Sequence, residues 1–231
     1  MIARLAIASV MFAPVPVIAQ SDTGTRLAGH PAQIPEHGTR TQRARIWLER
    51  YVACVDRRDS KGVSMALDAS FESEDAALGN LSRGYFDDCL SGGLRDDPSE
   101  LRMTDTLLRG ALYAERVNRQ VHRLTPEMLP RDTLALPDAA SAGAKAARVS
   151  VIRFGECVVH KDPVNSLAFV KAEAGSGRED KALAVLGPAF GECVNAGTTV
   201  KLSRSNIEAA LAEAIYRMTA APDAAIRTSG N

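Results

Sequence analysis

Residues 51–67 read YVACVDRRDSKGVSMAL, and residues 154–170 read FGECVVHKDPVNSLAFV. When the two stretches are aligned without a gap, an aromatic residue, a cysteine and an aspartate fall at matching positions. The matched cysteines are Cys54 and Cys157, and the matched aspartates are Asp59 and Asp162. Matches at such distinctive residues, in one order, indicate an internal repeat.

The match continues toward the C-terminal side of each stretch. GYFDDCL ends at Leu90 and falls on PAFGECV, which ends at Val194, so that Cys89 meets Cys193. Beyond them, LLRGAL falls on NIEAAL. We therefore predict two tandem copies of one unit, over residues 43–122 and 146–219.

Each unit has the apolar periodicity of helices. In the first unit, Trp47, Tyr51, Cys54 and Val55 follow the i, i+4, i+7, i+8 spacing of one helical face. This spacing turns the cysteine toward the interior and leaves Glu49 for solvent. The second unit is expected to repeat the same helix.

Local signals place the remaining helices. Asp59 and Asp162 suit the N-cap of a short second helix, and a third helix is predicted over about residues 74–90. Pro188 predicts a kink or a late start in the counterpart of this third helix. A fourth helix is predicted in each unit, the second of them opening with a capping box of Ser205 and Glu208. The fold class is therefore all-α, with about four helices in each disulfide-stapled unit and one short extended segment each, at residues 101–104 and 200–203.

The four cysteines predict two disulfide bonds. An even number of cysteines in an exported chain favours disulfides, and four cysteines allow three pairings. Units that arose by duplication should each fold alone, which favours Cys54 with Cys89 and Cys157 with Cys193. Each bond closes a loop of about 35 residues and restricts the unfolded chain by roughly 3–4 kcal/mol. The spacing fits neither a Cys-x-x-Cys redox motif nor a structural zinc site.

The segments outside the units have a different composition. Residues 1–19 run from a basic start through an apolar stretch to small residues, as a secretory signal peptide does. Residues 20–42 and 220–231 are predicted to be disordered, and residues 123–145, rich in proline and alanine, are predicted to be a linker. We expect a periplasmic or secreted protein with no transmembrane segment once the signal peptide is removed.

Charge and motifs argue against several classes of function. Lys plus Arg and Asp plus Glu both number 28, so no strongly basic surface for nucleic acid is expected. The sequence has no Gly-x-Ser-x-Gly elbow and no His-Glu-x-x-His motif. Glu156, His160 and Asp162 are better explained as a helix end and a cap than as acid-base machinery. Glu74 and Asp75 are better explained as a helix start than as calcium ligands. No catalytic, cofactor-binding or metal-ligating residue is predicted.

Small residues recur at equivalent places in the two predicted fourth helices. They are Gly110 and Ala111 in the first unit and Ala209 and Ala210 in the second. Small side chains commonly permit close helix packing, which is the first interpretation. The functional alternative is a groove for a peptide between the two units.

The segments FGECVVHKDP, which starts at Phe154, and ALAEAIYRM, which ends at Met218, resemble a group of exported alphaproteobacterial proteins with tandem Cys-containing helical units. This resemblance implies export and assigns no site residue. We expect a non-catalytic protein of the cell envelope that binds a protein or a peptide. One alternative is an inhibitor or immunity-type protein for a secreted toxin or hydrolase. The other is an enzyme without a recognisable linear motif, which predicts a pocket of titratable groups with shifted protonation.

Overall fold

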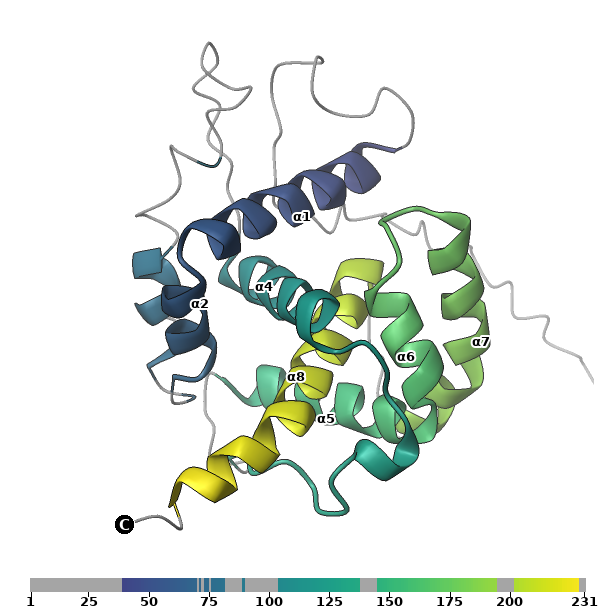
Figure 1. Ribbon diagram of the computed structural model, residues 1–231. Coiled ribbons are helices and arrows are strands. Elements are labelled where there is room, and N and C mark those ends of the chain that lie inside the picture. The colour runs from purple at the N-terminus through teal and green to yellow at the C-terminus, as the bar shows by residue number, and fades with distance from the viewer. Residues whose placement is uncertain are drawn as a thin grey trace, which may run out of the picture.

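The protein is all-α, as its sequence predicts (Figure 1). The computed structural model describes residues 39–69, 71, 73–74, 76–81, 89, 104–137, 145–194 and 202–228. These residues form helices and connecting turns without a strand. Most of the two predicted extended segments, over residues 101–104 and 200–203, lies outside the described residues.

The two halves of the chain present their helices in the same order. The first half contains α1 (Arg40–Arg58), α2 (Ser60–Leu67) and α4 (Asp105–Gln120), with helical turns at residues 76–81 before α4. The second half contains α5 (Ala146–Lys161), α6 (Pro163–Val170), α7 (Gly177–Cys193) and α8 (Arg204–Thr228). A short 3-10 helix, η2 (Pro126–Met128), lies between the two halves in the sequence.

The corners between the first two helices of each half have nearly the same backbone conformation. Asp59 has φ −140° and ψ 64°, and Asp162 has φ −146° and ψ 80°. Each aspartate accepts a hydrogen bond from a backbone N–H three residues later, at 2.7 Å from Gly62 and 3.0 Å from Asn165. The predicted N-caps are confirmed, and they explain why α2 and α6 begin where they do.

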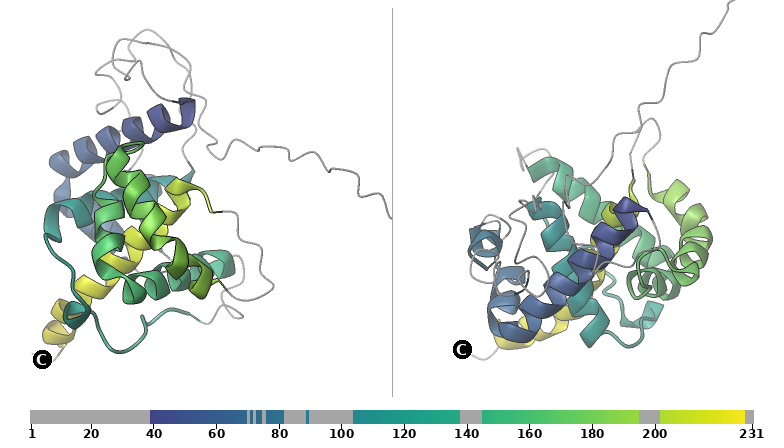
Figure 2. Two further views of the ribbon diagram at one scale, coloured as in Figure 1. Left: turned by 90° about the vertical axis from the view of Figure 1, so that its right-hand side faces the viewer. Right: turned by 90° about the horizontal axis from the view of Figure 1, so that it is seen from above.

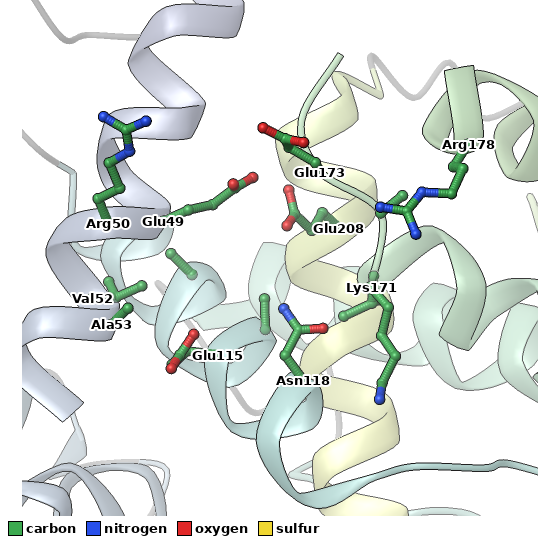
Figure 3. A pocket seen from close by; sticks show the side chains of 14 residues that line it. Glu49, Arg50, Val52, Ala53, Glu115, Asn118, Lys171, Glu173, Arg178 and Glu208 are labelled. Atoms are coloured by element: carbon green, nitrogen blue, oxygen red, sulfur yellow. The ribbon is translucent and has the colours of Figure 1, made fainter. Parts of the chain in front are cut away.

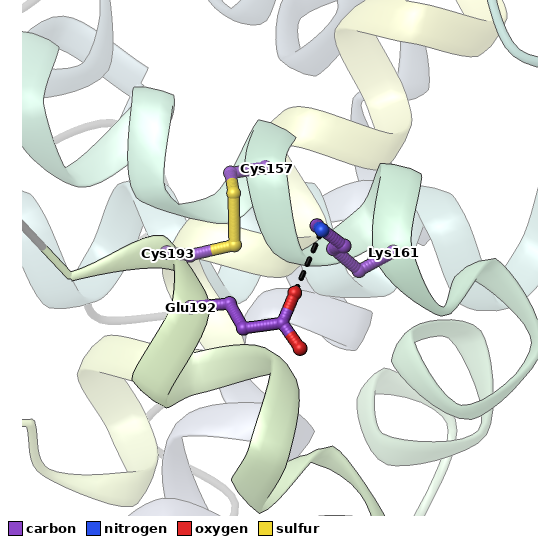
Figure 4. Close-up of a disulfide and its surroundings, with 4 residues drawn as sticks. All are labelled: Cys157, Lys161, Glu192 and Cys193. Carbon is purple, nitrogen blue, oxygen red and sulfur yellow. Dashed lines mark ion pairs between the residues drawn. A yellow bond between two sulfur atoms is a disulfide. The ribbon is translucent and has the colours of Figure 1, made fainter.

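Each half contains one disulfide. Cys54 is bonded to Cys89 with a Cα–Cα distance of 5.7 Å, and Cys157 is bonded to Cys193 with 5.8 Å. This is the pairing that the repeat favours. Figure 4 shows the second bond, which ties α5 to the end of α7.

The halves share one hydrophobic core, because α8 packs against α4 of the first half as well as against α5 and α6 (Figures 1 and 2). A Cβ on Gly110 would lie 2.3 Å from the Cβ of Ala209, so α4 and α8 cross at a point where only small residues fit. A Cβ on Gly155 would lie 2.2 Å from the carbonyl oxygen of Ala210. These contacts support the packing interpretation for Gly110, Ala209 and Ala210.

The segment predicted to be a linker belongs in part to this core. Leu124, Leu129 and Leu134 are buried, and the backbone N–H of Leu134 donates to Glu156 at 2.6 Å. Composition did not predict this because proline and alanine together outnumber the leucines of the segment. The segment therefore packs in the core and is hydrogen-bonded to α5.

Three predicted boundaries differ from the structure. Helix α1 already begins at Arg40, where Thr39 caps it, within the segment predicted to be disordered. Helix α8 continues to Thr228, past the predicted end of the second unit. Helix α7 begins at Gly177 and includes Pro188, so the proline does not delay its start.

Two buried arginine–glutamate contacts cross from one half to the other. Arg45 of α1 donates to Glu179 of α7 at 2.6 Å, and Arg148 of α5 donates to Glu74. Arg45 and Arg148 occupy matching positions in the repeat, and Glu74 and Glu179 are both fully buried in the first turn of a helix. The ionic contact is thus made twice, once in each direction.

Glu74 is the more heavily paired of the two acids. Arg109 and Arg217 each place a nitrogen 3.5 Å from its carboxylate, and the hydroxyl of Tyr113 donates to it at 2.9 Å. The interpretation of Glu74 as a residue of a helix start holds for its backbone position, whereas its side chain serves the interface between the halves.

We predict a single unfolding transition in denaturant, since the core is continuous. Replacing Cys54 and Cys89 together by alanine should lower the free energy of unfolding by about 3–4 kcal/mol, and so should replacing Cys157 and Cys193. Each double variant should shift the same transition in circular dichroism. Two transitions, of which each variant moves only one, would contradict the shared core.

We predict that Glu74→Gln lowers the free energy of unfolding by about 3–5 kcal/mol, because it removes a fully buried charge that pairs with Arg109, Arg148 and Arg217 and leaves the last two with Glu213 as their carboxylate partner. The matched control is Lys161→Ala, which removes an ion pair with Glu192 whose side chains are 53% and 59% exposed (Figure 4). The control should cost less than about 1 kcal/mol. The free energies of unfolding are measured by chemical denaturation at pH 7. An equal decrease in the two variants would show that the buried ion pairs of Glu74 stabilise the fold no more than an exposed pair does.

Candidate functional site

A pocket of about 330 Å³ opens between the two halves (Figure 3). Its walls come from α1 and α4 of the first half, and from α8, the start of α7 and the connection between α6 and α7 of the second. Neither half alone would enclose it. Its lining residues are Glu49, Arg50, Val52, Ala53, Ala111, Ala114, Glu115, Asn118, Val170, Lys171, Ala172, Glu173, Arg178 and Glu208.

The apolar part of the lining consists of small side chains. Val52 and Ala53 come from α1, and Ala111 and Ala114 come from one face of α4. Because alanine reaches little beyond the backbone, α1 and α4 leave space between them at this level. The small residues of α4 therefore have two roles. Gly110 permits the close crossing of α4 and α8, and Ala111 lines the pocket.

Three carboxylates from three different segments converge at one side of the pocket, as Figure 3 shows. Glu49 comes from α1, Glu173 from the α6–α7 connection and Glu208 from α8. The side chain of Glu208 is 14% exposed and accepts from Nη2 of Arg45 at 2.7 Å. The arginine that joins the halves through Glu179 thus also anchors one acid of the pocket.

The connection that carries Glu173 is held by its own contacts. Gly175 has φ +74°, a conformation that favours glycine, and its N–H donates to Glu179 at 2.6 Å. Gln42 of α1 donates to the carbonyl oxygen of Ala174 at 3.4 Å. These contacts fix the loop against α1 and set the position from which Glu173 reaches the pocket.

The convergence of carboxylates alters their protonation. Burial and the nearby charge of Glu208 raise the pKa of Glu49 to about 7, against the opposing effects of Arg45 and a hydrogen bond from the backbone of Ala174. Burial also raises the pKa of Glu208, although Arg45 opposes this. Near neutral pH, the carboxyl group of Glu49 is therefore only partly ionised.

The rest of the rim is polar and mixed in charge. Arg50, Lys171 and Arg178 contribute cations, and Asn118 contributes an exposed amide. In Figure 3, Lys171 and Asn118 lie away from the three converging carboxylates, on the same side as Glu115. Burial and the charge of Asp56 raise the pKa of Glu115. The pocket is therefore acidic at one end and mixed at the other.

The residues weighed as acid-base machinery lie outside this pocket. Glu156 is buried, accepts from Leu134 and pairs with Arg153 at 2.7 Å. His160 is exposed in the last turn of α5, and Asp162 caps α6. The structure gives each of the three a position in the helix ends or the core, as the first interpretation expects.

Two of the pocket acids were misjudged from sequence. Glu49 lies in the pocket, although the apolar stripe of α1 leaves it for solvent. Glu208 pairs with Arg45, and the helix cap is Ser203, whose hydroxyl accepts from the backbone N–H of Asn206 at 3.2 Å. The capping box of Ser205 and Glu208 was therefore wrong. No local signal identifies either acid, because their partners lie in the other half.

Neither family models, curated proteins nor solved structures gave a match to this chain. Among the described residues, no group of three His, Cys, Asp or Glu side chains is arranged to hold a metal ion. In the same part of the chain, no helix combines the length and the apolarity that a membrane span requires.

We predict that the carboxyl group of Glu49 titrates near pH 7 in a carbon-detected NMR experiment, well above its ordinary pKa of 4.5. Between these values the folded chain keeps a proton that the unfolded chain releases, so the contribution of Glu49 to stability falls as pH rises. Glu49→Gln should therefore gain about 1–3 kcal/mol relative to the wild type between pH 5 and pH 8.

The matched control for this titration is Glu192→Gln. Glu192 is exposed, and a hydrogen bond from Lys161 lowers its pKa, so this variant should gain no stability as pH rises. A Glu49 midpoint below pH 5 would mean that the three carboxylates do not converge in solution.

Proposed function

We propose that this chain is an exported, non-catalytic protein of the cell envelope that binds a protein or peptide in the pocket between its two halves. The observation that carries the proposal is the pocket itself, which is open, has an apolar floor and is framed by polar groups from both halves. Binding sites of this composition fix a ligand through a few placed polar groups while the apolar surface supplies contact area.

Export is proposed on separate grounds. The two disulfides are of a kind that persists in oxidising compartments, and residues 1–19 have the order of a secretory signal peptide. The matching order of helices in the two halves, with matching caps and disulfides, supports an origin by tandem duplication.

A second candidate, acid-base catalysis, is favoured by one specific observation. Glu49 and Glu208 lie near one another, and both have raised pKa values, as a catalytic pair of carboxyl groups often has. The described lining of the pocket includes no hydroxyl, thiol or imidazole group. The binding function is preferred because burial and like charge account for both pKa shifts without a reaction.

We predict that the full chain, produced with its own leader in a Gram-negative host, reaches the periplasm with its N-terminus at about residue 20 and without free thiols. Retention in the cytoplasm with four reduced cysteines would contradict export.

In irradiated cells, a photo-crosslinking residue at Asn118 should give one discrete adduct, while the same residue at Met65, which is 65% exposed on α2, should give none.

The adduct must also depend on the pocket. Ala111→Phe, which fills the floor, should remove it without moving the chain out of the periplasm. Equal crosslinking from both positions, or an adduct unaffected by Ala111→Phe, would contradict binding at the pocket. A solution of the purified chain that turns over a substrate, with loss of turnover in Glu49→Gln, would favour the enzyme instead.

A further inference from the structure

We propose that the pocket receives the positively charged end of a lysine or arginine side chain carried by the polypeptide partner. This proposal rests on the proposed function and names the chemistry that its site recognises. It follows from the joint arrangement of three carboxylates, an apolar floor and a polar rim around one cavity.

The charge of the ligand follows from the acidic end. Glu49, Glu173 and Glu208 point toward one another from α1, the α6–α7 connection and α8 (Figure 3). Arg45 is not part of the lining, and it pairs with both Glu208 and the fully buried Glu179, so that its charge is shared between the two acids. A cation placed among the three carboxylates relieves their mutual repulsion and donates charge-assisted hydrogen bonds to their oxygens.

The shape of the ligand follows from the floor. Val52, Ala53, Ala111 and Ala114 form a small apolar surface next to the acids. Lysine and arginine have a methylene stem that packs on such a surface while the charged end remains hydrogen-bonded. A volume of about 330 Å³ lies at the lower end of ligand pockets, and it suits one long side chain with its neighbouring backbone.

A polypeptide, rather than a free amine, is indicated by the other side of the cavity. Asn118 is exposed there and offers both a donor and an acceptor, the pair of groups that a peptide unit requires. Lys171 and Glu115 lie on the same side, and their opposite charges leave this end without the excess of negative charge that a second cation of a polyamine would need (Figure 3). The site therefore suits a ligand with one cationic end and a neutral, hydrogen-bonding body.

Affinity should depend on pH through Glu49. The charged groups around this carboxyl are Arg45 and Arg50 on its own helix, Glu208 of α8 and Glu173 of the α6–α7 connection, with Glu115 of α4, Lys171 and Arg178 elsewhere in the lining. Because a bound cation favours the ionised carboxylate, binding should release a proton near pH 7 and should strengthen from pH 6 to pH 8.

The test uses the full mature chain and three N-acetylated, C-amidated peptides of the form Gly-Ser-X-Ser-Gly, where X is lysine, norleucine or glutamate. Norleucine has the stem of lysine without its charge. Dissociation constants are measured by NMR shifts at pH 8 for the wild type, Glu49→Gln and Glu192→Gln. The lysine peptide should bind about 10-fold more tightly than the norleucine peptide.

The variants separate a pocket contact from a general effect of charge. Glu49→Gln should remove most of the preference for lysine, while Glu192→Gln, which deletes the same charge on the exposed part of α7, should keep it. From pH 6 to pH 8 the wild type should gain several-fold in affinity for the lysine peptide, and Glu49→Gln should not. Both variants should show the amide spectrum of the folded wild type.

Each other outcome overturns a defined part of the proposal. Equal binding of the three peptides in the pocket would overturn the cationic ligand and leave peptide binding intact. Binding of cadaverine but of none of the peptides would overturn the polypeptide source. No binding by any of these probes would overturn the cationic ligand, while the crosslinking from Asn118 would separately decide whether another ligand occupies the pocket.

Discussion

The structure depends on two buried arginine–glutamate contacts that cross between its halves. A buried carboxylate without a counter-charge is costly. Glu74 and Glu179 each have one arginine of their own half nearby, Arg109 at 3.5 Å and Arg204 at 3.2 Å, but a closer contact to each acid comes from the other half. Arg45 and Arg148 supply this charge from matching positions in the two halves. Since Arg45 also binds Glu208, the same contact that joins the halves sets the acidic end of the pocket.

The disulfides and the ionic contacts stabilise different parts of the structure. Each disulfide connects helices within one half, whereas each arginine reaches into the other half. Between the two halves, Gly110 of α4 touches Ala209 of α8, with which it is aligned in the sequence comparison.

Local signals in the sequence predicted much of the fold. The helical stripe around Tyr51, the capping aspartates and the cysteine spacing depend on neighbours in the chain, and these features were predicted correctly. The pocket acids and the buried part of the linker depend on distant partners. Arg45 and Glu179 are 134 residues apart, and periodicity along one helix cannot show which charged residue meets an arginine of another. The continuity of the core could not be predicted for the same reason, because the contacts of α8 with α4 join residues far apart in the chain.

The pairing of Glu74 also constrains the order in which the interior can be completed during synthesis. Arg148 follows Glu74 by 74 residues, and Arg217 follows it by 143 residues. A ribosome therefore releases the acid long before two of its basic partners exist. The first disulfide becomes available early, once Cys89 has emerged, and Arg109 of the same half is the first of the basic partners to follow. The pairing of this buried acid is completed only when the last helix brings Arg217, so a chain that ends before Arg217 lacks one of its contacts and part of α8.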